Sequence, residues 1–117
     1  MYPNDDVKIP VGNDHLKYDK DKPRMDLLDP LAIEGLATVL TYGAIKYQAH
    51  GWREGIQYSR LIAALLRHLF AIIRGEFIDP ESGLHHIDHV GANWMFLSKE
   101  IKTRGDLNDL YKEEIHK

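Results

Sequence analysis

The chain has 117 residues, no cysteine and a formal net charge of −3 with its histidines neutral. The lack of cysteine excludes disulfides, thiol catalysis and cysteine-based zinc or iron–sulfur sites, and it fits a reducing compartment. The negative charge excludes an overall basic field of the kind that binds duplex nucleic acid.

The length fits one domain, residues 1–117, which would bury roughly two-thirds of its unfolded surface. The longest apolar runs, residues 61–66 and 68–73, are too short to cross a bilayer. The N-terminal segment lacks the basic start and apolar stretch of a signal peptide. We therefore expect a cytoplasmic protein.

Residues 1–29 are rich in proline, aspartate and lysine and show little hydrophobic periodicity. This composition predicts an extended arm rather than a packed element. Such an arm can lie across the body of the domain or over a site. Its basic residues, which suit a small phosphorylated ligand better than a long polymer, are Lys17, Lys20, Lys22 and Arg24.

A first helix is predicted over residues 31–48, where apolar residues recur at helical spacing. Asp29 is a typical N-cap, and Pro30 is typical of the first helical position. Gly35 and Gly43 each weaken the helix by about 1 kcal/mol relative to alanine. Their presence predicts a close approach of another helix or of a ligand.

A second helix is predicted from Tyr58 or Ser59 to Arg74, with Gly75 as its C-terminal stop. This helix is apolar nearly all round. A helix of that kind is buried in its own domain or shared with a partner subunit. We expect a homo-oligomer, a dimer or larger.

A third helix is predicted over residues 84–103, and Gly105 ends it. A short, charged fourth helix is predicted over residues 106–115. The predicted core face of the third helix consists of Ile87, Val90, Gly91, Trp94, Leu97 and Ile101. The fold class is therefore all-α, a small bundle of three to four helices over residues 30–115 with an extended N-terminal arm.

Four acids (Glu76, Asp79, Glu81 and Asp88) and three of the seven histidines lie at the start of the third helix and in the turn before it. His86, His89 and Asn93 follow one another at i, i+3 and i+7, so they share one stripe of the helix. If the second and third helices pack antiparallel, His68 lies about level with His89 or Asn93. Two imidazoles at this spacing can share a metal ion, and a carboxylate would complete the site.

The turn supplies that carboxylate from Asp79 or Glu81. Each residue also has an ordinary structural explanation, since a buried His68 is more often a hydrogen-bonded core residue and Asp79 can cap the turn. The cluster as a whole favours a functional site, because polar groups that converge on a core need partners. A one-residue shift of the helix start decides whether His85 or His86 points inward.

Arg60 and Arg67 are seven residues apart on one face of the second helix and suit the oxygens of an anionic ligand. A surface charge or an interface salt bridge explains them equally well. Trp52, in a glycine-flanked loop, can stack on a base or plug the end of the bundle. Trp94 is expected in the core, and Glu34 is expected at the surface rather than in the pocket.

Three groups of motifs in this chain are similar to those of a known family. The first is K-Y-D-x-x-K-P-R at residues 17–24, and the second is G-A-x-K-Y at residues 43–47 with Trp52 after it. The third is R-H-L at residues 67–69, then G-E-x-x-D-P-E-S-G-L-x-H at residues 75–86, with His89 and Asn93 beyond. Over residues 17–97 the chain resembles the phage-associated family of dATP/dGTP diphosphohydrolase N-terminal domains.

The resemblance implies metal-dependent hydrolysis of a purine deoxynucleoside triphosphate to monophosphate and pyrophosphate, in phage nucleotide metabolism in the host cytoplasm. The implied ion is Mg²⁺, Mn²⁺ or Co²⁺. The helical layout is also similar to the MazG-like all-α pyrophosphohydrolases, which work as dimers or higher oligomers. The pair of motifs that those enzymes use, E-x-x-E followed by E-x-x-D, is absent here, and His86-x-x-His89 stands roughly where the second motif would be.

The resulting hypothesis assigns residues to three roles. The predicted metal ligands are His68, Asp79, His86 and His89, and the predicted catalytic residues are Asp79, Glu81 and His86. The predicted substrate-binding residues are Lys22, Arg24, Lys46, Trp52, Arg60, Arg67 and Asn93. The ligand is a purine nucleotide, with no nucleic acid polymer and no membrane as partner.

Three other hypotheses stay open at this point. The first is a nucleotide-binding protein without turnover, which would need the arginines and Trp52 but no metal. The second is a structural helical oligomer whose histidines satisfy one another. The third is a metal phosphohydrolase of the HD type, although Ile87 separates His86 from Asp88, so no adjacent His-Asp pair occurs at this site.

Overall fold

The computed structural model describes residues 21–113. The arm prediction for residues 1–20, with Lys17 and Lys20, lies outside the described residues, as does the end of the predicted fourth helix. Over the described range the chain forms three α-helices and three short 3-10 helices. The pairing of Ile78 with His85 is an isolated β-bridge, and residues 21–113 contain no strand. The predicted all-α fold is confirmed.

The helix α2 (Pro30–Lys46) begins where the sequence predicts. The Asp29 side chain accepts a hydrogen bond from the Ala32 N–H at 3.1 Å, and Pro30 occupies the first position. Before this helix, residues 21–29 are exposed and contain only η1 (Met25–Leu27). After it, η2 (Gly51–Glu54) and Gly55, with a φ of 116°, lead into the next helix.

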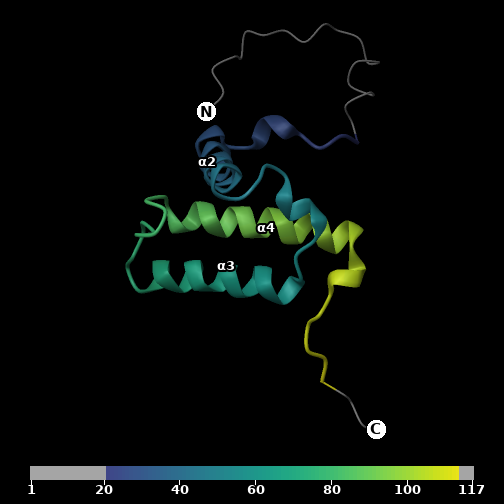
Figure 1. Ribbon diagram of the computed structural model, residues 1–117. Coiled ribbons are helices and arrows are strands. Elements are labelled where there is room, and N and C mark those ends of the chain that lie inside the picture. The colour runs from purple at the N-terminus through teal and green to yellow at the C-terminus, as the bar shows by residue number, and fades with distance from the viewer. Residues whose placement is uncertain (1–20, 114–117) are drawn as a thin grey trace, which may run out of the picture.

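The helices α3 (Tyr58–Ile73) and α4 (His86–Thr103) lie antiparallel and pack along each other (Figure 1). Figure 1 shows α2 nearly end-on against the opposite side of α4. The helix α4 therefore lies between α2 and α3, and it contacts both. No helix among residues 21–113 is long and apolar enough to cross a membrane.

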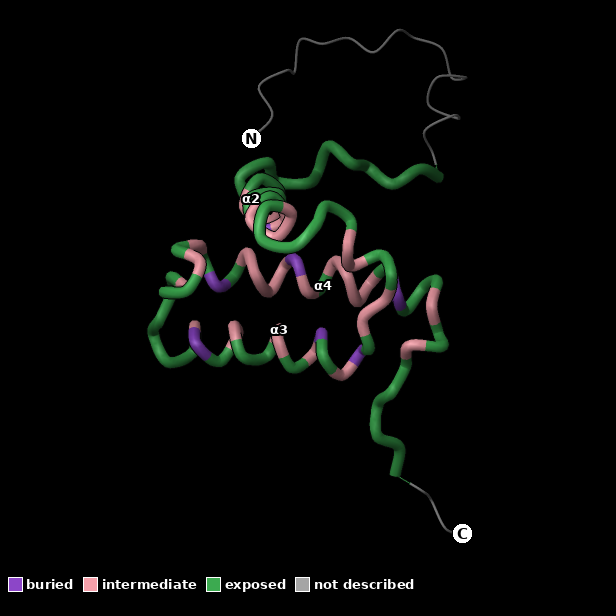
Figure 2. Tube along the Cα trace, in the orientation of Figure 1, coloured by how far each residue is buried: buried purple, intermediate pink, exposed green. Residues whose placement is uncertain are grey.

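The buried residues follow the faces where these helices meet, as the purple segments of Figure 2 show. They include Val39 from α2, Leu61 and Ala71 from α3, and Ala92 from α4. Two polar side chains of α4, His86 and Glu100, are also buried, with exposures of 5% and 3%.

The predicted core face of the third helix is wrong at three positions. Ile87, Trp94 and Ile101 are 56%, 57% and 58% exposed in the chain by itself. The helix is turned by one residue, so that His86 and Glu100 face inward in place of their neighbours Ile87 and Ile101. His86 is hydrogen-bonded to His68 and Glu76, and Glu100 accepts from the Ile56 N–H, which accounts for this orientation of the helix.

The predicted fourth helix is also wrong within the described residues. After α4 the chain forms only η3 (Gly105–Leu107), and residues 108–113 are not helical. The Asp109 carboxylate instead accepts hydrogen bonds from the N–H and the hydroxyl of Ser59, in the first turn of α3. Asp109 thus caps α3 from fifty residues away in sequence. These hydrogen bonds lower the pKa of its carboxyl.

The two glycines of α2 differ in their surroundings. A Cβ added at Gly35 would lie 2.4 Å from an Asp88 carboxylate oxygen, whereas one added at Gly43 meets nothing within 4 Å. The predicted close approach is therefore confirmed at Gly35, where α2 crosses α4. At Gly43 no neighbouring atom of residues 21–113 requires glycine.

We expect different effects when each glycine is replaced by alanine. Gly35→Ala should raise the free energy of unfolding less than Gly43→Ala does, because its methyl group must displace the Asp88 carboxylate. Gly43→Ala should raise it by up to about 1 kcal/mol through helix propensity alone. Urea unfolding followed by circular dichroism measures both. An equal gain from both substitutions would contradict the packing of α2 on α4.

Candidate metal centre and arginine-lined groove

The turn between α3 and α4 presents Asp79 to the helix pair. Gly75 and Gly83, with φ of 94° and 74°, take the left-handed conformation that the turn requires. The Asp79 N–H donates to the Leu84 carbonyl at 2.8 Å, and the Asp79 side chain accepts from the Glu81 N–H at 2.9 Å. The carboxylate is thereby fixed, and the Asp79 side chain is only 13% exposed.

Three elements bring His68, Asp79 and His89 together. One ligand atom of each residue lies within 4.8 Å of the others. The rings of His68 on α3 and His89 on α4 stack with centroids 4.5 Å apart and planes at 6°. Asp79 Oδ2 lies 3.7 Å from His89 Nε2. We call these three residues the trio.

His86 contacts the trio through His68. Its Nδ1 is 2.8 Å from Nδ1 of His68, and its Nε2 is 2.7 Å from Oε1 of Glu76. Both ring nitrogens of His86 are therefore engaged. Its neighbour His85 is exposed, so it is His86 that points into the domain.

With an ionised Glu76 and a neutral His86, the chain of hydrogen bonds from Glu76 through His86 favours one tautomer of His68. An ionised Glu76 carboxylate only accepts, so Nε2 of a neutral His86 carries the hydrogen and its Nδ1 is an acceptor. His68 must then donate from Nδ1, which leaves the lone pair on its Nε2. A hydrogen-bonded neighbour of this kind orients an imidazole for metal binding.

The donor set of the trio fits a divalent ion. Two imidazoles and one carboxylate can bind first-row transition ions such as Mn²⁺ and Co²⁺, and three ligands leave further positions open for water or ligand oxygens. Mg²⁺ prefers oxygen ligands. All three residues of the trio are of intermediate burial, so none of them is sealed in the core.

Burial lowers the pKa of both His68 and His89. Repulsion from His86 acts in the same direction on each imidazole, whereas the Asp79 carboxylate raises both pKa values in part. The guanidinium of Arg67 also lowers the pKa of His68. The two imidazoles thus favour the neutral form, which is the form that binds metals.

Acid is expected to destabilise the protein through these two histidines. Below the ordinary pKa of 6.5, the unfolded chain takes up protons at positions where the folded chain does not. The free energy of unfolding therefore falls as the pH drops from 6.5 until the lowered folded pKa is passed. Urea unfolding between about pH 7.5 and 5.5 measures this. His68→Gln should reduce the slope, and a slope unchanged by His68→Gln but removed by His85→Gln at the surface would contradict the prediction.

A groove of about 320 Å³ runs between α3 and α4 beside the trio. Its lining consists of Ile56, Arg60, Leu61, Ala63, Ala64, Arg67 and Asn93. The structure thus brings together three residues predicted to bind substrate: Arg60, Arg67 and Asn93. The Asn93 amide donates to the His89 carbonyl at 2.9 Å, so the groove adjoins the trio through one turn of α4.

The structure places other predicted substrate-binding residues outside this groove. Lys46 Nζ lies 3.3 Å from a carboxylate oxygen of the exposed Glu81, which ties the end of α2 to the turn. Trp52 stacks on Phe96 with ring centroids 4.8 Å apart, about 10 Å along α4 from His89. Its indole therefore packs on the other end of the bundle.

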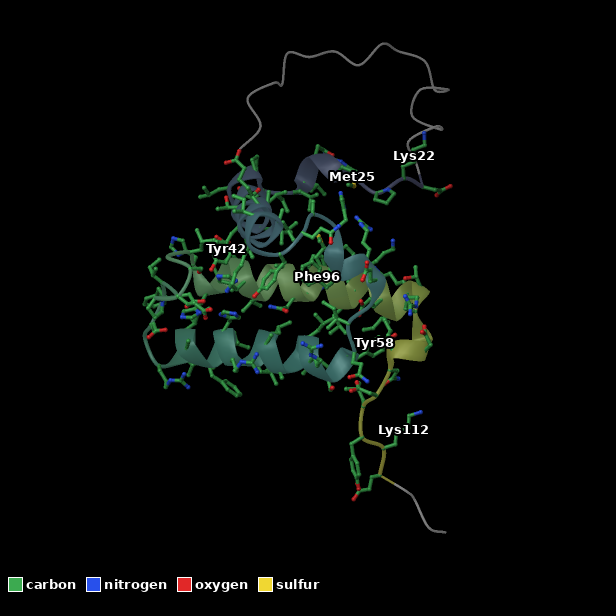
Figure 3. All side chains as sticks on the ribbon, in the orientation of Figure 1. Lys22, Met25, Tyr42, Tyr58, Phe96 and Lys112 are labelled. Carbon is green, nitrogen blue, oxygen red and sulfur yellow. The ribbon has the colours of Figure 1, made fainter. Side chains whose placement is uncertain are left out.

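Two predicted residues of the arm lie farther away. Figure 3 shows Lys22 beyond α2, on the side away from α3. Arg24 pairs with Asp26 at 2.7 Å, and both side chains are exposed. In the single chain neither residue reaches the trio.

The sequence patterns do not predict some contacts of the site. Ser82 Oγ lies 2.8 Å from His89 Nε2, and the Tyr42 ring of α2 meets His89 edge-on with centroids 6.5 Å apart. Glu76 was one of several acids with no assigned role, yet it holds His86. Only the fold of the turn and the crossing of α2 create these contacts, so no local spacing could have shown them.

The fold and the site together define a small all-α domain with a candidate two-histidine, one-carboxylate metal centre beside an arginine-lined groove. The profile of the family described as dATP/dGTP diphosphohydrolase, N-terminal, matches residues 12–110. The chain belongs to this family.

One curated relative supports the same assignment. A protein of Salmonella phage PMBT28 named dATP/dGTP diphosphohydrolase is 33% identical over 94 residues, which are 80% of this chain and 32% of that protein. The chain thus spans about a third of the length of the relative that it matches. No solved structure matches the chain significantly.

Proposed function

We propose that this domain hydrolyses purine deoxynucleoside triphosphates, dATP or dGTP, to the monophosphate and pyrophosphate with the help of a divalent ion. The observation that carries the proposal is the position of the trio beside the groove of Arg60 and Arg67. A candidate metal centre next to two guanidiniums suits a polyphosphate chain. The name of the phage relative agrees with this substrate class.

The proposed roles fall on two neighbouring surfaces, the trio and the groove. His68, Asp79 and His89 would hold the ion, which when bound supplies a positive charge near the phosphates and a more acidic water. Arg60 and Arg67 would bind phosphate oxygens through charge-assisted hydrogen bonds. The donor set favours Mn²⁺ or Co²⁺ over Mg²⁺.

His86 would act through His68 rather than as a ligand. The hydrogen bonds of His86 to His68 and to Glu76 support this role, because with a neutral His86 they would hold the imidazole of His68 with its Nε2 free. Burial lowers the pKa of His89, and the charge of the exposed Glu81 offsets a small part of that lowering, so Glu81 acts on the trio. We assign to its carboxylate the acceptance of a proton from the attacking water.

We also propose that the domain works as a homo-oligomer in the host cytoplasm. Ile87, Trp94 and Ile101 recur every seven residues on α4, and all three are exposed in the single chain. A stripe with this repeat favours a second helix packed along it. Light scattering tests the assembly, and a monomer at every concentration would contradict it.

The proposed reaction is tested by incubation with each of the four deoxynucleoside triphosphates in the presence of Mg²⁺, Mn²⁺ or Co²⁺, followed by chromatography of the products. Monophosphate plus pyrophosphate from dATP or dGTP, lost on chelation, is the expected result. Diphosphate plus phosphate would move the assignment to another phosphohydrolase reaction. Nucleotide that stays intact but bound would favour the non-hydrolytic alternative.

A further inference from the structure

Ser82, in the turn between α3 and α4, contacts the candidate metal centre but has no role in the proposed reaction. Its Oγ lies 2.8 Å from Nε2 of His89 and accepts a hydrogen bond from the Leu84 N–H at 3.2 Å. The same Nε2 of His89 lies 3.7 Å from Asp79 Oδ2. The serine hydroxyl therefore meets the trio at the imidazole nitrogen that is nearest to its carboxylate.

One turn positions both Ser82 and Asp79. The Gly83 N–H donates to the Asp79 carbonyl at 2.7 Å, and Asp79 Oδ1 accepts from the Glu81 N–H at 2.9 Å. With Oδ1 engaged in this way, Oδ2 is the oxygen that lies toward His89. Two oxygen atoms from one hydrogen-bonded turn thus lie within 3.7 Å of one imidazole nitrogen.

The distance from Ser82 Oγ to His89 Nε2 suits two ligands of one ion. Ligand atoms lie about 2.1 Å from an octahedral ion, so two of them at right angles are about 3 Å apart. The observed 2.8 Å is close to this spacing. An ion that takes the lone pair of Nε2 removes the acceptor of the Ser82 hydroxyl. The hydroxyl can then turn its hydrogen away and direct a lone pair of Oγ at the ion.

We propose that Ser82 Oγ is a fourth protein ligand of the divalent ion, together with His68, Asp79 and His89. A hydroxyl is a hard oxygen donor, and a serine or threonine hydroxyl holds Mg²⁺ in P-loop proteins. The four donors are two nitrogens and two oxygens, which leave two positions of an octahedral ion for water or phosphate oxygens. The proposal rests on the proposed function in one respect, the binding of an ion by the trio.

The sign of a change in affinity distinguishes a ligand from a competitor of the ion. If Ser82 is a ligand, Ser82→Ala weakens the binding of Mn²⁺, and we expect a loss of about tenfold. A hydroxyl that only satisfied His89 Nε2 would have to be displaced by the ion, so its removal would tighten binding. Electron paramagnetic resonance of free Mn²⁺ measures the affinity without turnover. Ser98→Ala is the matched control, because Ser98 has the same intermediate exposure and is bonded to Lys102.

A second variant reports on the bond itself and does not depend on the folding of Ser82→Ala. Ser82→Cys replaces the hydroxyl with a thiol, and a thiolate bound to Co²⁺ gives a charge-transfer band in the near-ultraviolet. The unaltered chain has no cysteine, so no other thiol contributes. We expect the band to saturate at one Co²⁺ per chain in Ser82→Cys and to be absent in Ser98→Cys.

The two measurements separate the role of Ser82 from the proposed function. Unchanged or tighter binding of Mn²⁺ by Ser82→Ala, or no charge-transfer band in Ser82→Cys, would overturn the proposal. If the unaltered protein still binds Mn²⁺ in that case, the trio stands and only the fourth ligand is wrong. If the unaltered protein binds no divalent ion, the metal-dependent function fails as well.

Discussion

Asp79→Asn is expected to lower the turnover of dGTP by about a hundredfold or more. Asp79 supplies the only carboxylate of the trio, at 3.7 Å from His89 Nε2. Asparagine has nearly the same shape, and its Oδ1 can still accept the hydrogen bond from the Glu81 N–H, so the turn is preserved. The charge that attracts a divalent ion is lost. Steady-state rates at saturating Mn²⁺ and a titration of Mn²⁺ measure both effects.

A matched control separates the loss of the metal ligand at Asp79 from the general loss of one negative charge. Asp21→Asn makes the same chemical change at an exposed position before α2. It should leave both the rate and the affinity for Mn²⁺ near those of the unaltered protein. An Asp79→Asn variant that keeps more than half of its activity would show that the trio does not hold the ion.

Arg67→Ala is expected to raise the KM for the triphosphate by about tenfold or more. Arg67 lines the groove, and its charge acts on His68, where it adds to the larger effect of burial in lowering the pKa. A phosphate oxygen would therefore lose a charge-assisted hydrogen bond close to the reacting group. Arg67→Lys should recover only part of the loss, because an ammonium cannot make the paired hydrogen bonds of a guanidinium.

Arg74→Ala provides the comparison for Arg67. Arg74 is exposed, follows the last residue of α3 and does not line the groove. Its removal changes the net charge by the same amount, so a general electrostatic effect would appear in both variants. Equal KM values for Arg67→Ala and Arg74→Ala would contradict the assignment of the groove to phosphate.

Local signals in the sequence predict the helices and their order well. The Asp29-Pro30 pair starts α2 where expected, because the cap depends only on residues within one turn. The core face of α4 could not be predicted, since Ile87 and His86 are adjacent and only tertiary contacts decide which of them is buried. The predicted fourth helix fails for the same reason, as Asp109 bonds to the distant Ser59.

The site shows the same division between local and long-range information. The spacing of His86, His89 and Asn93 on one helix follows from the sequence, and antiparallel packing brings His68 to them as expected. The sequence could not show that Glu76 engages His86, because that contact depends on the path of the turn. Nor could it show that Glu100 is buried, since a glutamate is seldom fully buried.

The central claim is that His68, Asp79 and His89 form a divalent-ion site, and NMR of the imidazole nitrogens tests it most directly. Zn²⁺ serves as the diamagnetic probe, titrated into protein labelled with ¹⁵N. We predict that one ring nitrogen of His68 and one of His89 shift and saturate at one ion per chain, while His50 and His85 stay unchanged. Shifts confined to exposed histidines, or none at His68 and His89, would contradict the account.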